Sequence, residues 1–315
     1  MGDTETQHRH FFVQMLKALN SLSRLPSLSI PRRYFSAKMS TNPDPICLKF
    51  ISVEGADICS RSKSDGIRFR LVSYNILAQV YVKSSLFPHS PPGCLRWKAR
   101  SQAILTVLDS LDAEFLCLQE VDEYDTFYKV NMESLGYSSI YIQRSGQKRD
   151  GCGIFFKADC AELLIEERIE YNDLVDLIQD ISISSGDKQN TVVVSEIKDD
   201  PKNVVTGSSL KGTRENHGDP NDPRVRLKRD CVGIMAAFKI KGPFHCIFIV
   251  ANTHLYWDPE WADVKLAQAK YLLSRLAQFK VLVSERYESA PSVILAGDFN
   301  SIPGDKVLQY FLFLL

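Results

Sequence analysis

The sequence of 315 residues predicts an α/β protein with mixed β-sheets, that is, an α+β arrangement. Strand-like runs rich in β-branched and aromatic residues outnumber the helical patterns, as expected for a fold built on sheets. Two of these runs, 232–240 and 245–255, are separated only by the turn at "KGP", so we expect them to pair as an antiparallel hairpin. A purely parallel, doubly wound sheet is therefore disfavoured.

Eight segments have the composition of buried or half-buried strands. In chain order they are 67–77, 114–120, 138–144, 152–158, 191–197, 232–240, 245–255 and 292–300.

Helical patterns fill the longer gaps between these strands. One follows Trp97 and continues through apolar residues at helical spacing, and a second covers 123–136 and ends at Gly136. A third begins at the Asp258-Pro259 pair. Its apolar face comprises Leu272, Leu276, Phe279 and Val283.

The chain divides into a basic leader (1–43), a linker (44–66) and one domain (67–315) with a polar, Gly/Pro-rich insertion at 198–230. The leader can form a basic amphipathic helix, has no acid from residue 11 until Asp44, and is typical of organellar transit peptides. Against targeting, Asp3 and Glu5 are unusual so early in a transit peptide, and Met39 could serve as an alternative start that discards the leader; the alternative is a disordered basic tail. Both localisations therefore stay open: mitochondrial targeting by residues 1–38, or the cytoplasm and nucleus.

Composition excludes some functions. The 38 basic and 38 acidic residues cancel, so no global field attracts a nucleic acid or a membrane, and a polyanion must be bound by a local patch or by metal ions. No apolar run approaches the roughly 18 residues of a membrane span, and no membrane partner is expected. Unpaired Cys and His positions also argue against a structural zinc site.

Polar side chains stand at four strand ends where an apolar strand would not otherwise keep them. They are Asn75, Glu120, His254, and the pair Asp298 and Asn300. Each alone is explained by a turn or a helix cap. Together they would place oxygen ligands, amides and an imidazole on one rim, which suits Mg²⁺ or Mn²⁺ and hydrolysis of a phosphoester.

Five motifs then occur in one order, which resembles that of a known family. They are "SYNILAQVY", "FLCLQEVDEYD", "KRDGCGIFFK", "VANTHLYWDP" and "ILAGDFNSIPGD". They resemble the deadenylases of the carbon catabolite repressor type, relatives of nocturnin and Angel in the exonuclease–endonuclease–phosphatase superfamily. The resemblance covers about residues 67–306. It implies a deoxyribonuclease I-like four-layer sandwich, two mixed sheets flanked by helices.

The resemblance also implies residue roles. Glu120 corresponds to the magnesium-binding glutamate, with Asn75 beside it at the metal and catalytic centre. Asp298 would orient or deprotonate the attacking water, His254 would donate to the phosphate, and Asn300 would touch the scissile phosphate. Substrate contacts are expected further along the rim, from Trp257, Pro259, Arg144, Lys148 and Asp150.

The implied reaction is Mg²⁺-dependent 3′→5′ hydrolysis of messenger-RNA poly(A), releasing 5′-AMP. Two Mg²⁺ ions are implied, and Mn²⁺ can substitute. The partner is single-stranded RNA, and without a leucine-rich repeat ahead of the motifs, stable membership of the deadenylase complex is not indicated. Two alternatives stay open: a hydrolase of dinucleotide phosphates or other small phosphoesters, and a catalytically inactive form that binds RNA or partners.

The sequence departs from the family pattern at the end of the chain. The family continues past "GDFNS" with further strands and a closing Ser-Asp-His, whereas no histidine here follows His254. The apolar ending "LQYFLFLL" resembles neither a helix cap nor a polar tail. We therefore expect a C-terminally truncated domain that lacks its last strands, exposes an apolar edge and is weak or inactive.

Overall fold

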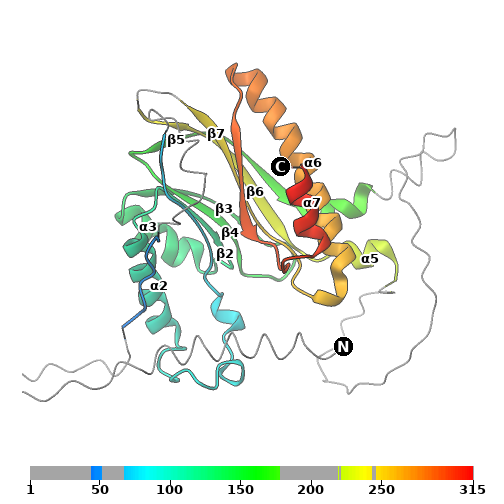
Figure 1. Ribbon diagram of the computed structural model, residues 1–315. Coiled ribbons are helices and arrows are strands. Elements are labelled where there is room, and N and C mark those ends of the chain that lie inside the picture. The colour runs from blue at the N-terminus through cyan, green and yellow to red at the C-terminus, as the bar shows by residue number, and fades with distance from the viewer. Residues whose placement is uncertain (1–43, 52–66, 178–218, 220, 243–245, 315) are drawn as a thin grey trace, which may run out of the picture. The chain divides into compact units, whose positions relative to one another are not determined.

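A computed structural model describes residues 44–51, 67–177, 219, 221–242 and 246–314. Two four-stranded sheets face each other in this part of the chain, and helices cover their outer faces (Figure 1). The predicted sandwich of two mixed sheets is confirmed. Within these ranges no helix combines the length and apolar character needed to cross a bilayer.

The first sheet has the strand order β1-β2-β4-β3. Its strands are β1 (Leu71–Asn75), β2 (Phe115–Gln119), β3 (Tyr137–Gln143) and β4 (Gly151–Lys157). β1 and β2 are parallel, and the other pairs are antiparallel. Its outer face packs on α2 (Trp97–Leu111) and on the Tyr124–Tyr128 and α3 (Lys129–Ser134) segment, and the chain then turns at Gly136, whose φ is +85°.

The second sheet has the strand order β5-β6-β7-β8. Its strands are β5 (Ala161–Glu170), β6 (Val232–Ile240), β7 (Ile247–His254) and β8 (Ser292–Asp298). The predicted hairpin is the antiparallel β6/β7 pair. α6 (Ala262–Tyr287) returns the chain so that β8 runs parallel to β7, and its predicted apolar face is buried against this sheet.

Aromatic rings fill the space between the sheets. Phe115 of β2 lies edge-on to Phe238 and Phe248 of the second sheet, with ring centroids 5.2 Å apart in both pairs. All five residues of β2 are buried because alternate side chains face the second sheet and the helical layer.

A buried polar bridge also joins the two sheets. Gln119 Nε2 donates to Asn252 Oδ1 (2.8 Å), and Asn252 Nδ2 donates to the carbonyls of Leu118 and Gly153 (2.9 Å each). Asn252 is fully buried and Gln119 is 1% exposed. Such amides tolerate burial only when fully paired, so the bridge fixes the register of one sheet against the other.

Seven of the eight predicted strands are present, and the run 191–197 lies outside the described residues. So do the leader, most of the linker and most of the insertion 198–230, whose end contains the short helix α5 (Pro223–Leu227). The sequence interpretation missed β5, because four glutamates interrupt its apolar pattern. Those charges suit a strand at the edge of a sheet.

The apolar ending forms helix α7 (Lys306–Leu314), a finding the sequence interpretation did not anticipate. Val307 and Phe311, four residues apart, are buried in the cluster between α6 and the second sheet. Among the described strands β8 is an edge strand. It contacts β1 through a hydrogen bond from Gly297 N to Ser73 Oγ (3.1 Å).

We predict that Asn252→Ala lowers the free energy of unfolding by about 3 kcal/mol, because it removes the three buried hydrogen bonds that join the two sheets. Urea unfolding followed by circular dichroism measures this loss. Asn221→Ala, at an exposed position, is the matched control and should stay within about 0.5 kcal/mol of the parent protein. Equal effects of the two variants would contradict the role of the bridge.

Candidate active site

Strand register brings the predicted polar residues to one rim. β1 and β2 end together because Asn75 pairs with Gln119, so Glu120 follows immediately at the same edge. β7 and β8 end together because His254 pairs with Asp298. The carboxyl ends of both parallel pairs therefore meet at one end of the sandwich, as the sequence predicted.

The side-chain amide of Asn75 joins the two halves of this rim. Its Nδ2 donates to Glu120 Oε1 (2.8 Å) and to Asp298 Oδ2 (2.9 Å). Its Oδ1 accepts from Leu77 N (2.9 Å), which fixes the orientation of the amide. Asn75 thus separates two carboxylates that would otherwise repel each other. The three residues lie together at the rim, as expected from the sequence.

Glu120 is held by its backbone as well as by Asn75. Its φ is +59°, a left-handed conformation that costs free energy in a residue other than glycine. Its Oε2 accepts from Ala78 N (3.0 Å). Each oxygen therefore has one donor and a remaining lone pair, and the carboxylate faces the cavity described below.

The motif around Asp298 depends on a glycine. Gly297 has a φ of +149°, and a Cβ there would lie 2.3 Å from the carbonyl oxygen of Thr253. Only glycine lets β8 approach β7 so closely at this point, which sets the position of the next residue, Asp298. Asp298 Oδ1 then accepts from Asn300 N (3.0 Å), closing the turn.

His254 Nε2 lies 3.7 Å from Asp298 Oδ2. Burial lowers the pKa of His254 below its ordinary value of 6.5, while the Asp298 and Glu120 carboxylates act in the opposite direction. The imidazole is therefore neutral at pH 7, with one nitrogen able to donate and the other able to accept.

Asn300 lines the cavity beside His254. Its φ is +46°, and its Nδ2 donates to the carbonyl of Leu255 (2.8 Å). Its own carbonyl accepts from Nζ of Lys265 (2.8 Å), a lysine only 3% exposed. The turn that carries Asn300 is thus anchored to Leu255, the residue after β7, and to α6.

Of the three residues expected to contact substrate on the other side of the rim, Lys148, Asp150 and Arg144, only some are free to do so. Lys148 is exposed and lines the cavity. Asp150 is fully buried, accepts from the Tyr81 hydroxyl (2.9 Å) and pairs with Arg144 (3.4 Å). Asp150 therefore orients its neighbours and does not reach a substrate, a correction that follows from its burial.

Arg144 also differs from the expectation of a free phosphate ligand. Its Nε and Nη2 donate to the carbonyls of Asp230 (3.0 Å) and Arg229 (3.3 Å), in addition to the pair with Asp150. Arg144 lines the cavity, but its donors are engaged in holding the chain segment before β6.

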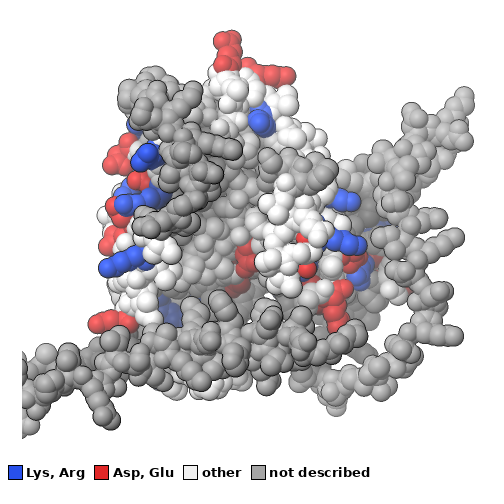
Figure 2. All heavy atoms as spheres, in the orientation of Figure 1, with Lys and Arg blue, Asp and Glu red and all other residues white. Residues whose placement is uncertain are grey.

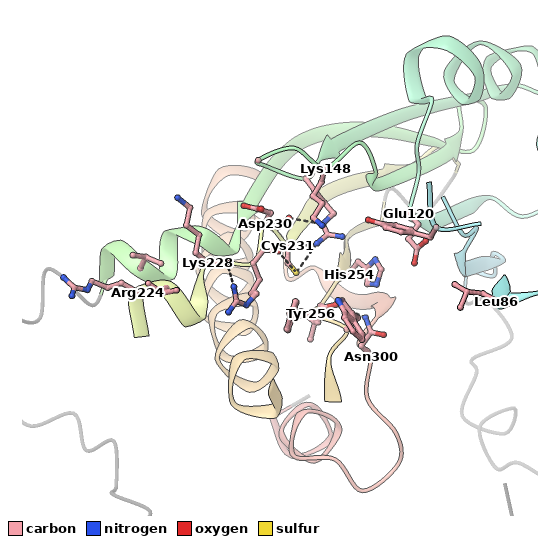
Figure 3. A pocket seen from close by; sticks show the side chains of 18 residues that line it. Leu86, Glu120, Lys148, Arg224, Lys228, Asp230, Cys231, His254, Tyr256 and Asn300 are labelled. Carbon is pink, nitrogen blue, oxygen red and sulfur yellow. Dashed lines mark hydrogen bonds between the residues drawn. The ribbon is translucent and has the colours of Figure 1, made fainter. Parts of the chain in front are cut away.

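A cavity of about 1130 Å³ opens beside the rim. Figure 3 shows Glu120, His254 and Asn300 on one side of it and Arg224 and Lys228 on the other. Trp257, 63% exposed, also lines it, whereas Pro259 is exposed on the adjoining loop outside the lining.

The basic wall at 224–229 was missed by the sequence interpretation, although the charge run "RVRLKRD" signalled it. On the face in Figure 2, basic and acidic atoms are interspersed, in keeping with the zero net charge. A polyanion would therefore be attracted to this cavity only by the local arrangement of its charges and not by the net charge of the chain.

The donor set fits a hard divalent cation. In the described ranges no group of three or more His, Cys, Asp and Glu residues could hold a metal by itself. Mg²⁺ is usually held by one or two carboxylates, with water and substrate phosphate as its other ligands. Glu120 supplies such a carboxylate, and Asp298 supplies a second one nearby. Asn75, predicted as a metal ligand, instead turns its Nδ2 toward both carboxylates, while its Oδ1 accepts from Leu77 N. Among the described residues of this rim the possible ligands are carboxylates, amides and one imidazole, a set better suited to Mg²⁺ than to zinc.

Comparisons with known proteins agree with this geometry. A model described as "Endonuclease/Exonuclease/phosphatase family" matches residues 72–314. The chain is 58% identical to carbon catabolite repressor protein 4 homolog 4 of Arabidopsis thaliana, over 90% of this chain and 74% of that protein. It is 29% identical to the CCR4-Not complex 3′-5′-exoribonuclease subunit Ccr4 of Schizosaccharomyces pombe, over 78% of this chain but 35% of that protein.

A similar solved structure is that of ANGEL2, described as a 2′,3′-cyclic phosphatase, in complex with adenosine-2′,3′-vanadate. The TM-score is 0.56 with 28% identity, and the match covers 77% of this chain and 56% of that chain. This chain therefore spans little more than half of that solved structure.

We predict that Asn75→Asp destabilises the metal-free protein by about 2 kcal/mol at pH 8 and by less at pH 5. A third carboxylate there is favoured in its protonated form, so its pKa rises on folding and stability is lost as pH rises. Urea unfolding at both pH values, in EDTA, measures the difference. Asn75→Ala adds no charge and should show a smaller pH dependence; the same dependence in both variants would contradict charge crowding.

We also predict that the imidazole of His254 titrates below pH 6.5 in the metal-free protein. Nuclear magnetic resonance of the ring nitrogens measures this pKa. Asp298→Asn removes a carboxylate that raises it and should lower the pKa further. An increase in that variant would show that Asp298 does not act on the imidazole.

Proposed function

This chain belongs to the endonuclease/exonuclease/phosphatase family of phosphoester hydrolases, and we propose that it is a Mg²⁺-dependent 3′→5′ exoribonuclease that shortens poly(A) and releases 5′-AMP. The observation that carries the proposal is the convergence of Asn75, Glu120, His254 and Asp298 on one rim, within hydrogen-bond or ion-pair distance of one another. The name of the fission yeast relative, a 3′-5′-exoribonuclease subunit, supports the choice of RNA as the substrate.

Each residue has a role that follows from its position. Glu120 would hold the cation, and the Asn75 amide positions its carboxylate. When bound, the cation would polarise a phosphoryl oxygen and favour ionisation of water. Asp298 orients the attacking water and accepts its proton as the oxygen–phosphorus bond forms. Neutral His254 and the Asn300 amide donate to the phosphoryl oxygens, where negative charge develops as the water oxygen adds to phosphorus. The bond to the 3′ oxygen then breaks, and this oxygen leaves as a hydroxyl after taking a proton from water.

The wall of the cavity suits a single-stranded substrate. Trp257 offers an exposed indole on which a base can stack, an interaction worth about 1–3 kcal/mol per base. Tyr256 lies beside it, with ring centroids 6.2 Å apart. Unpaired adenines can be bound in this way, whereas the bases of a duplex are already stacked on each other.

A second candidate is hydrolysis of a 2′,3′-cyclic phosphate. It is favoured by the similarity to the ANGEL2 structure, whose description names that activity. The same carboxylates, imidazole and amides would serve that reaction, since it also opens a phosphoester bond. Hydrolysis of a dinucleotide phosphate, and RNA binding without catalysis, are the remaining outcomes that an assay must distinguish.

We predict that purified protein with Mg²⁺ shortens a labelled oligoadenylate one nucleotide at a time from its 3′ end. Parallel reactions contain adenosine 2′,3′-cyclic phosphate or a dinucleotide phosphate. Asp298→Asn should lower kcat by about 10²–10⁴ because the group that takes the proton is lost. Asp109→Asn, on the exposed face of α2, is the control and should be fully active.

Glu120→Gln should raise the Mg²⁺ concentration needed for half-maximal rate, which tests the assignment of the cation to this carboxylate. Faster turnover of the cyclic phosphate than of oligoadenylate would replace the proposal with the second candidate. Cleavage of the dinucleotide alone, or binding without cleavage, would reject it.

A further inference from the structure

The segment between α5 and β6 carries Arg229, an arginine that the mechanism above does not use. Arg229 lines the cavity together with Glu120 and His254. Its neighbours Arg224 and Lys228 lie on the side of the cavity away from Glu120 and His254 (Figure 3). Arg229 therefore belongs to the wall that a longer substrate would reach beyond the reacting phosphate.

The backbone that presents Arg229 is firmly held. Asn172 Oδ1 accepts from the backbone N–H groups of Arg229 and Asp230 (3.1 Å each). Asn172 Nδ2 and Ser145 Oγ donate to Asp230 Oδ1 (2.8 and 3.3 Å). Arg144 adds its bonds to the two carbonyls, and Asp230 has a φ of +53°. So many contacts to a strained turn indicate a site built to hold one conformation.

The guanidinium of Arg229 lies on aromatic rings. Its central carbon is 4.1 Å from the ring centroid of Trp261 and 5.4 Å from that of Tyr256. Its Nη1 donates to the carbonyl of Lys228 (3.0 Å). Its Nε is buried and has no acceptor among the described residues. A buried donor without a partner is uncommon.

Three other arginines of the cavity and of this segment are each paired with an aspartate. Arg144 pairs with Asp150 (3.4 Å), Arg224 with Asp222 (2.7 Å) and Arg226 with Asp263 (2.6 Å). In the described part of the chain no carboxylate pairs with Arg229. Among these four arginines, only its charge therefore remains available to an anion.

We propose that Arg229 binds a backbone phosphate of single-stranded RNA, a phosphate other than the one that is hydrolysed. The inference deepens the proposed function and rests on it for the identity of the strand. A guanidinium matches two phosphate oxygens, and the rings beneath it keep its plane fixed. Arg229 would thus favour substrates with more than one phosphate over mononucleotides.

Binding without hydrolysis tests this inference. Fluorescence anisotropy in EDTA gives the Kd of a labelled oligoadenylate, and competition gives the Kd of 5′-AMP. Arg229→Gln should weaken oligoadenylate binding about tenfold, as expected for one charged hydrogen-bonded contact, and leave the Kd of 5′-AMP unchanged. The slope of log K against log salt should fall by about 0.7, the value for one phosphate on a single strand.

Arg226→Gln is the matched control, since Arg226 lies 4.0 Å from the same Trp261 ring but is paired with Asp263 and does not line the cavity. It should change oligoadenylate affinity less than twofold. Arg229→Lys retains the charge and should keep the salt slope of the parent protein. Circular dichroism and thermal unfolding of each variant show whether its fold is retained.

An equal loss for 5′-AMP, an unchanged salt slope, or an equal loss in Arg226→Gln would overturn the inference. So would a parent protein that binds no oligoadenylate, even if it hydrolyses a cyclic phosphate. Conversely, Arg229-dependent binding by a protein that cleaves no oligoadenylate would support the inference and reject the proposed exoribonuclease activity.

Discussion

The register between the two sheets is the constraint on which the site depends. Asn252 and Gln119 form a polar bridge through an otherwise apolar interior, and all the hydrogen bonds of the Asn252 amide end on the first sheet. Apolar packing alone would tolerate small slips of one sheet over the other, because the hydrophobic effect is not directional. Directional bonds from a buried amide remove that freedom. Both residues lie one or two positions before the rim, so the position of the rim follows from the bridge.

At the rim itself, two carboxylates of like charge lie close together. Glu120 and Asp298 come from different sheets. An ionised carboxylate can only accept hydrogen bonds, so the two cannot bond directly to each other. The Asn75 amide lies between them and satisfies one oxygen of each. Backbone N–H groups donate to the other oxygen of each carboxylate. These hydrogen bonds hold the two carboxylates close together, an arrangement that suits a divalent cation. Burial keeps His254 neutral beside it, so the imidazole can donate one hydrogen bond without adding a charge.

The opposite wall of the cavity carries positive charge. A chain with no net charge has to bind a polyanion by placing unpaired positive charge at one point. Arg144 and Arg224 line the cavity but are paired with aspartates, whereas Arg229 lies on a tryptophan ring without a carboxylate partner in the described residues. Aromatic support lets a guanidinium keep its charge in a half-buried place, since the ring attracts the cation without neutralising it.

The sequence by itself determined most of the strands, the hairpin, the mixed sheets and the polar strand ends, because alternation and strand termini are local patterns. It missed β5, where glutamates interrupt the pattern, and it did not foresee α7, whose apolar face becomes evident only against α6. Tertiary structure alone decided how the site is held. Asn75 and Asp298 are 223 residues apart, and no local pattern says that one amide spans two carboxylates. The burial of Asp150, the engagement of Arg144 and the unpaired charge of Arg229 likewise depend on neighbours distant in sequence. A charged residue in a motif reveals that chemistry is present, but its partners, which only the packed chain supplies, decide whether it binds a substrate or supports a residue that does.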